Sequence, residues 1–106
     1  MGQTTKEQIE RIKQMEERLD RASAVVMRLS AALDDYAEAQ SAIRELSAYY
    51  ESDEWKKDFA DDEQGILPKD LKRGVLSEDG LWNLLADCRT LNNQMRELTQ
   101  IIPDAQ

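Results

Sequence analysis

The residues best suited to chemistry in this sequence are six acids in its middle third. They are Asp53, Glu54, Asp58, Asp61, Asp62 and Glu63. Carboxylate oxygens are the ligands that hard cations such as calcium prefer. An EF-hand loop does not fit, because setting Gly65 at its sixth position puts Ala60 at the first and Leu71 at the twelfth. We therefore interpret these acids as a solvated face, partly neutralised by nearby lysines, and predict no metal and no cofactor.

Arg73 is the best candidate for a polar site, together with Glu78 and Asp79. A guanidinium group can pair with a carboxylate through two hydrogen bonds, so an internal bridge across the turn is the favoured interpretation. The alternative is an enzyme or anion binder that uses Arg73, Asp58, Glu78 and Asp79 at a helix N-terminus, where backbone donors converge. The two acids at 78 and 79 argue against an anion there, since they already occupy the positive end of the helix.

The tryptophans and the single cysteine have structural and functional interpretations. Trp55 and Trp82 are candidate anchors for a partner, because tryptophan is enriched in binding hot spots, although a core position is favoured for both. Cys88 falls on an apolar helix face and is interpreted as a small buried hydrophobe. The chain has no histidine. Zinc sites and Ser-His or Cys-His catalytic systems within one chain are therefore excluded, and no catalytic residue is predicted.

Two heptad runs supply the elements that must position these residues. The spacing alternates between three and four residues, which places the side chains on one face of a helix. The first run is Ile12, Met15, Leu19, Ala22, Val26, Leu29, Leu33, Tyr36, Ile43 and Tyr50, and the second is Leu81, Leu84, Cys88, Leu91, Met95, Leu98 and Ile102. We predict an all-α fold in which a long N-terminal helix, 5–51, and an antiparallel C-terminal helix, 78–102, form a hairpin within a single domain, 1–106.

The two helices differ in length, at about 70 Å and about 37 Å for the usual helical rise. The shorter helix therefore covers only part of the longer one, and the apolar side chains of residues 9–26 need another partner. Either the long helix breaks near Asp34 to form a three-helix bundle, or a second copy covers the exposed half. We favour a homodimer, because no glycine or proline lies between residues 5 and 51 and a reversal usually needs such residues.

Residues 52–77 are predicted to cap the hairpin with short helices. Ser52 is a good N-cap for a short helix, and Gly65 suits the left-handed position that ends it. Pro68 is expected to begin a single turn that Gly74 ends, and Ser77 is expected to cap the last helix. The apolar side chains expected to form a plug are Trp55, Phe59, Ile66, Leu67, Leu71, Val75, Leu76 and Trp82.

Net charge and hydropathy limit the classes of partner. The net charge is −8, and it lies in the middle: residues 34–63 carry three basic and eleven acidic groups, whereas residues 1–33 carry six and five. An acidic surface repels phosphate backbones, so we predict no nucleic-acid binding. The sequence contains no apolar run long enough to predict a membrane span. With one cysteine and no recognisable secretory signal, a cytoplasmic location is expected.

The middle of the sequence also resembles a known family. The residues that carry the resemblance are Tyr49, Tyr50, Ser52, Trp55, Asp58, Gly65, Leu67, Pro68, Leu71 and the run Arg73-Gly74-Val75-Leu76-Ser77-Glu78-Asp79. On these residues the chain is similar to a bacterial family described as domain of unknown function 4298. The resemblance covers nearly the whole chain. It implies a small single-domain bacterial protein and no particular activity.

These observations predict a non-enzymatic protein–protein interaction module, a helical homodimer with an acidic end. The candidate interaction residues are Trp55, Asp58, Asp62, Arg73, Glu78 and Asp79. A basic protein is the expected partner, because charge complementarity speeds association. Two alternatives stay open at this point. One is the anion binder or enzyme at Arg73, and the other is an acidic mimic of nucleic acid that blocks a DNA-binding protein.

Overall fold

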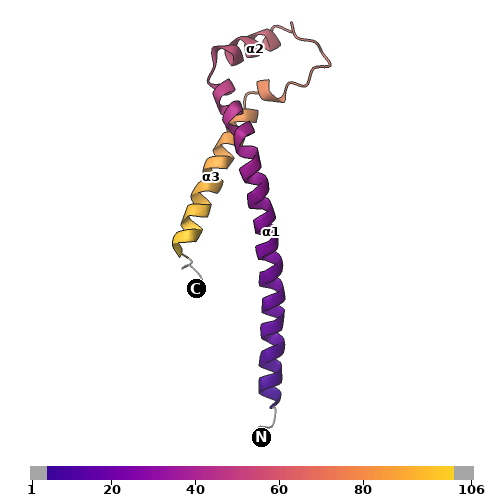
Figure 1. Ribbon diagram of the computed structural model, residues 1–106. Helices are drawn as coiled ribbons and strands as arrows, with labels where there is room; N and C mark the ends of the chain where they lie inside the picture. The colour runs from indigo at the N-terminus through magenta and orange to yellow at the C-terminus, as the bar shows by residue number, and fades with distance from the viewer. Residues whose placement is uncertain (1–4, 102–106) are drawn as a thin grey trace. The chain divides into compact units, whose positions relative to one another are not determined.

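The computed structural model describes residues 5–101 and divides them among four helical elements (Figure 1). These are α1 (Lys6–Tyr50), α2 (Asp53–Glu63), the 3-10 helix η1 (Gly74–Leu76) and α3 (Gly80–Ile101). No strand occurs among the described residues. The predicted all-α class, with a long first helix, a last helix and a short helix between them, is confirmed.

Helix α1 is continuous from Lys6 to Tyr50, so the predicted alternative of a break near Asp34 is wrong. Helix-forming residues without glycine or proline explain why no turn interrupts it. Thr5 caps its start, since the Thr5 hydroxyl accepts a hydrogen bond from the Gln8 amide at 3.0 Å.

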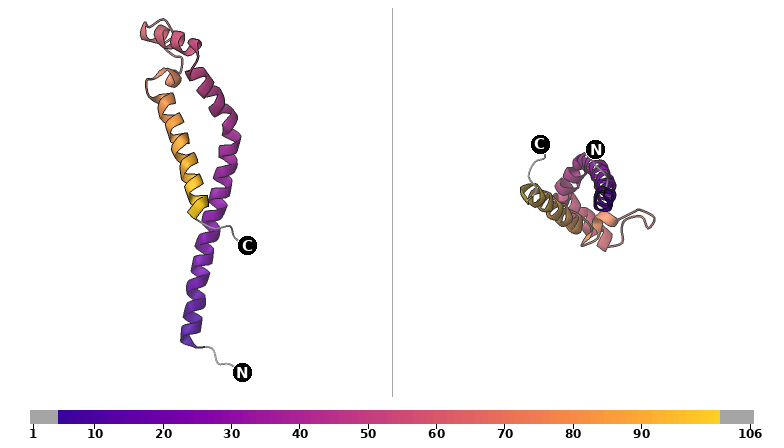
Figure 2. Two further views of the ribbon diagram at one scale, coloured as in Figure 1. Left: turned by 90° about the vertical axis from the view of Figure 1, so that its left-hand side faces the viewer. Right: turned by 90° about the horizontal axis from the view of Figure 1, so that it is seen from below.

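The internal contacts divide the chain into two units, residues 1–40 and residues 41–106. In its described part, the first unit consists of α1 alone, and α1 has no buried residue. The second unit holds the end of α1 together with α2, η1 and α3. Within it the chain reverses through α2 and η1, and α3 runs back antiparallel to residues 41–50 (Figure 2). The single-domain organisation stays a prediction.

The capping residues of the middle segment are confirmed with one exception. Ser52 has the extended backbone of an N-cap, and its side chain accepts a hydrogen bond from the Trp55 amide. Gly65 follows α2 with φ 73°, a conformation that favours glycine. Pro68 begins a turn closed by the Leu71 amide at 3.2 Å. Gly74 was expected to end this turn, but it begins η1 instead.

Helix α3 begins at Gly80, two residues later than predicted. Ser77 still acts as its cap, because its hydroxyl oxygen accepts a hydrogen bond from the Gly80 amide at 3.0 Å. The same hydroxyl donates to the Gly74 carbonyl at 2.9 Å, which ties the helix start to η1. Residues 78 and 79 form a turn between the two helices instead of the first turn of α3.

The core of the second unit is small. Leu76 of η1 and Leu81 of α3 are the buried hydrophobic residues among those described, with 6% and 3% of their surface exposed. The predicted plug forms only in part, because of its eight members Leu76 is buried and Trp55, Phe59 and Leu67 are half-buried. Its remaining members are exposed, namely Ile66, Leu71, Val75 and Trp82. The core position predicted for Trp82 is wrong, since 55% of that residue is exposed.

Candidate functional site

Three of the six acids in the middle segment are half-buried and held in internal contacts. The Tyr49 hydroxyl donates to Asp58 Oδ2 at 2.6 Å. Lys57 Nζ donates to Asp61 Oδ2 at 2.8 Å, and Arg73 Nη1 donates to Asp62 Oδ1 at 2.6 Å. Asp58, Asp61 and Asp62 are all half-buried. They therefore stabilise the second unit rather than form the solvated face that the sequence predicted for all six.

The Tyr49–Asp58 hydrogen bond joins the end of α1 to α2. Burial raises the pKa of Tyr49 to about 12, and the hydrogen bond to Asp58 and the negative charges of Asp58 and Glu54 act in the same direction. The phenol therefore keeps its proton at any physiological pH. Tyr49 is a fixed hydrogen-bond donor here, which argues against a role as an acid catalyst.

Arg73 pairs with Asp62 of α2 rather than with Glu78 or Asp79. The two side chains are 35% and 24% exposed, so the ion pair is partly shielded from water. Glu78 and Asp79 are both exposed in the turn before α3. The predicted bridge from Arg73 to the start of the last helix is therefore wrong. The anion site proposed on the same residues also loses support, because the guanidinium group already has an internal carboxylate partner.

Trp55 connects three elements of the second unit. Its ring meets Tyr50 edge-on, with centroids 4.9 Å apart, and stacks on Phe59 at 5.1 Å. Its indole N–H donates to the Val75 carbonyl at 2.9 Å. Trp55 is half-buried. Because both its ring and its polar atom serve internal contacts, the geometry favours a structural role over that of an exposed anchor.

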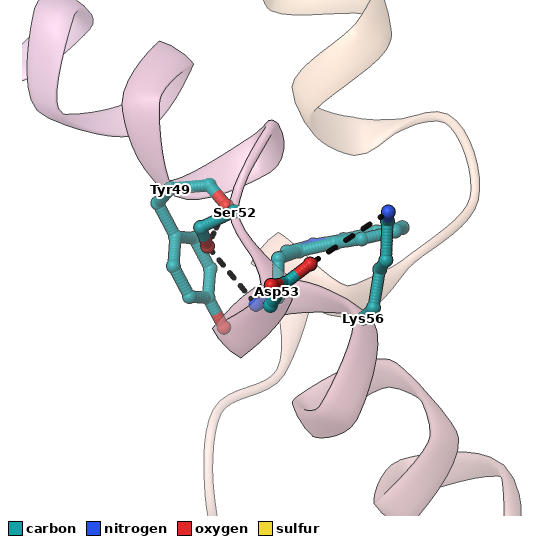
Figure 3. Close-up of polar contacts among 5 residues, drawn as sticks. Tyr49, Ser52, Asp53 and Lys56 are labelled. Carbon is teal, nitrogen blue, oxygen red and sulfur yellow. Dashed lines mark hydrogen bonds and ion pairs between the residues drawn. The ribbon is translucent and has the colours of Figure 1, made fainter.

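Figure 3 shows the polar contacts at the first turn of α2. There the Ser52 hydroxyl accepts a hydrogen bond from the Trp55 amide at 3.1 Å and donates to the Tyr49 carbonyl. Asp53 and Lys56 form an ion pair of 3.9 Å, with both side chains largely in solvent. Glu54 and Glu63 are also exposed. Asp53, Glu54 and Glu63 are therefore the exposed acids of α2.

The part of the chain that the structure describes gives no support to a metal site or a membrane span. Among residues 5–101, no three acids or cysteines converge in a way that could hold a metal ion. No helix in that range is long and apolar enough to cross a bilayer. The acidic residues of α2 therefore act as separate charges and ion-pair partners.

Two open grooves in the second unit are better candidates for binding surfaces. One, of about 450 Å³, is lined by Leu46, Lys72, Gly74, Val75, Gly80, Leu81 and Leu84. The other, of about 390 Å³, is lined by Ile43, Arg44, Ser47, Tyr50, Glu51, Trp82, Leu85, Cys88, Arg89 and Asn92. Both lie between the end of α1 and α3, and both are largely apolar.

Of these groove residues, sequence reasoning singled out Trp82 alone as a candidate anchor for a partner. The heptad pattern contained part of the signal, because Ile43, Tyr50, Leu81, Leu84 and Cys88 are all seam positions. Seam residues were expected to close against one another. The pattern could not show that the seam stays open, since that depends on how η1 and α2 hold the two helices apart.

The fold and contacts define a small helical protein in which α2 and η1 cap the junction between a long and a shorter helix. The chain belongs to the family described as Domain of unknown function (DUF4298), whose profile matches residues 12–98. The predicted family membership is therefore confirmed. No curated protein and no solved structure matches the chain.

Proposed function

We propose that this protein is a non-enzymatic interaction module that works as a homodimer. The observation that carries the proposal is an apolar stripe on the first unit. The stripe consists of Ile9, Ile12, Met15, Leu19, Val26, Leu29 and Leu33, and each of these residues is at least 42% exposed. A helix with such a stripe normally buries it against another element, and most helical stability in proteins comes from that burial.

The size of the stripe supports an interface. Together with the neighbouring Val25, it presents eight large side chains that are 42–64% exposed. Their combined area is on the order of 800 Å², which is about what one partner contributes to a specific protein–protein interface. Soluble proteins rarely leave a continuous apolar surface of that size in water.

Charge supports a second copy as the partner of the stripe. Residues 1–33 carry six basic and five acidic groups, so this segment has a net charge of +1 in a chain whose net charge is −8. An approach between two acidic middle segments meets strong repulsion, whereas an approach between two copies of residues 1–33 meets almost none. Self-association through the stripe is therefore compatible with the overall acidity of the protein.

The exposed acids of α2 support a further, basic protein partner. Asp53, Glu54 and Glu63 are exposed, whereas Asp58 and Asp62 have internal partners. A basic surface would be attracted to these exposed charges, with an association rate that falls as salt is added. The small number of exposed acids on α2 weakens the alternative of a nucleic-acid mimic, because such a mimic needs a long series of exposed acids. A cytoplasmic location stays part of the proposal.

Sedimentation equilibrium at micromolar concentrations tests the dimer. Leu19→Arg places a charge in the stripe, and Ala31→Arg places the same charge on the opposite face of α1 as a matched control. We expect the wild type and Ala31→Arg to sediment as dimers and Leu19→Arg as a monomer, because an unpaired charge in an apolar interface is strongly unfavourable. A monomeric wild type, or a dimer that Leu19→Arg leaves intact, would refute the proposal.

A further inference from the structure

The charge along α1 changes where the stripe ends. Residues 1–33 carry a net charge of +1, whereas residues 34–50 carry four acidic groups and one basic group, a net of −3. Helix α1 is continuous from Lys6 to Tyr50 (Figure 1). Two copies paired in parallel through the stripe would therefore continue side by side through their acidic ends. That arrangement meets repulsion between like charges.

An antiparallel pair avoids this repulsion. The stripe runs from Ile9 to Leu33, so it overlaps most fully with an antiparallel copy of itself when the twofold axis lies near residue 21. The nearest register that keeps seam residues opposite seam residues sets Leu19 against Ala22 of the second copy. The two Asp34 residues then lie about 40 Å apart along the helix axis at the usual rise. Exposed charges at that distance are screened, because the Debye length is about 8 Å at physiological ionic strength.

The seam residues also fit one another in this register. The contacts, each made twice by symmetry, are Leu19 with Ala22, Met15 with Val26 and Ile12 with Leu29. Ala22 is the smallest seam residue of this segment, and it meets a leucine, so the layers differ little in volume. A parallel pair would set Ala22 against Ala22 between two bulky layers and leave a gap, which well-packed interfaces avoid.

The flank of the stripe that carries arginines is compatible with the same register. In an antiparallel pair each flank faces the same flank of the other copy, so Arg18 lies beside Val25 and Arg11 beside Ala32. The aliphatic stem of an arginine can cover such apolar side chains while its guanidinium group stays in water. A parallel pair would set Arg11 beside Glu16, but an exposed ion pair contributes at most about 1 kcal/mol.

From these features we propose that the stripe pairs antiparallel with the stripe of a second copy, with Leu19 opposite Ala22. The twofold axis then crosses α1 between residues 20 and 21, and both copies contribute the same surface. The inference rests on the proposed homodimer and adds its orientation and register. It places the two acidic middle segments at opposite ends of the paired helices, so that one dimer offers two separate acidic ends to basic partners.

Distances between spin labels test the orientation. A nitroxide label is attached to a cysteine introduced at Glu38 or at Ala24, in a Cys88→Ser background that leaves one thiol in each chain. Both positions are exposed, and their place in the heptad sets them on the side of α1 opposite the stripe. In the antiparallel dimer the labels of Glu38→Cys should lie at least about 50 Å apart. In a parallel dimer they would lie about 30 Å apart, since only the width of two packed helices separates them.

The label at Ala24→Cys is the matched control. In the antiparallel register its two copies are only about 10 Å apart along the helix axis, so both orientations predict a distance of about 30 Å. The measurements are made at concentrations where sedimentation equilibrium shows each labelled chain to be dimeric. Circular-dichroism spectra confirm that the labelled chains keep their helical content.

Each outcome of this experiment decides something different. A long distance at Glu38→Cys together with a short one at Ala24→Cys supports the antiparallel pair. A distance at Glu38→Cys as short as that at Ala24→Cys shows a parallel pair, and an intermediate distance shows another register. Either result overturns the inference while the homodimer stands. A wild-type chain that sediments as a monomer removes the proposed function itself.

Discussion

The two units of this chain are stabilised in different ways. In the first, residues 6–40 form part of one helix whose apolar side chains are exposed. In the second, an aromatic group around Trp55, two polar pairs and two buried leucines join four elements. In its described residues the first unit therefore rests on helix propensity alone, whereas the second has tertiary contacts of its own.

That difference shows which part of the fold a local sequence pattern specifies and which part depends on distant contacts. A long run of helix formers specifies α1 locally, whatever surrounds it. The second unit depends on contacts between residues far apart in the chain, such as Trp55 with Val75 and Arg73 with Asp62. Variants that remove one contact should therefore affect the two units very unequally.

The largest expected contrast is between two leucines replaced by alanine. Leu81 is 3% exposed and Leu19 is 58% exposed. Leu81→Ala should lower the free energy of unfolding of the second unit by about 2–4 kcal/mol, as expected for a cavity in a core. Leu19→Ala should change it by less than about 0.5 kcal/mol. Urea titration followed by tryptophan fluorescence measures this unit, since Trp55 and Trp82 both lie in it.

A second contrast concerns two glycines near the start of α3. A Cβ at position 80 would lie 2.6 Å from Ser77 Oγ and 2.7 Å from the Gly74 carbonyl oxygen, whereas one at position 74 meets nothing within 4 Å. Gly80→Ala should therefore lower the free energy of unfolding by about 1–2 kcal/mol, despite the better helix propensity of alanine. Gly74→Ala is the control, and equal effects of the two changes would contradict the tight start of α3.

Tyr49 makes the second unit sensitive to alkaline pH. The pKa of Tyr49 is raised to about 12 in the folded protein, against about 10 for an unfolded tyrosine. Its contribution to stability is therefore complete below pH 10 and is lost as the pH rises from about 10 to 12. Tyr49→Phe should cost about 1 kcal/mol at pH 8 and remove this part of the alkaline decline. Tyr50→Phe keeps the ring against Trp55 and should behave like the wild type in the same urea titrations.

The Arg73–Asp62 pair should have a smaller effect than any of these destabilising changes. A double-mutant cycle with Arg73→Met and Asp62→Asn should give a coupling of about 0.5–1 kcal/mol, because the pair is only partly shielded. High salt should reduce the coupling. The Lys57–Asp61 pair on one face of α2 has its lysine 75% exposed, so its coupling should be smaller. A larger coupling for Lys57–Asp61 would reverse the order that burial predicts.

Much of the fold could be predicted from the sequence because its signals are local. The continuity of α1 follows from the lack of glycine and proline. Ser52 and Ser77 act as N-caps because their hydroxyl oxygens accept hydrogen bonds from backbone amides at the start of a helix. Gly65 follows the end of α2 because glycine readily adopts the positive φ found there. None of these features requires knowledge of distant residues.

The site was harder to predict because its partners are distant in sequence. Arg73 was assigned to Glu78 and Asp79 on proximity along the chain, yet the turn after Pro68 returns it to Asp62 of α2. Tyr49 pairs with Asp58 across the Ser52 cap, a geometry that residue spacing alone does not give. Trp82 was placed in the core on its apolar character, but it lies on the rim of an open groove.

Hydrogen exchange of the whole chain at several concentrations tests the central contrast most directly. If a second copy covers the stripe, the amides of residues 9–33 should be protected at high micromolar concentration and lose protection on dilution. Those of residues 53–76 should change little, because their contacts lie within one chain. Protection of residues 9–33 that is independent of concentration would contradict the account, since it would show that this part of α1 needs no partner.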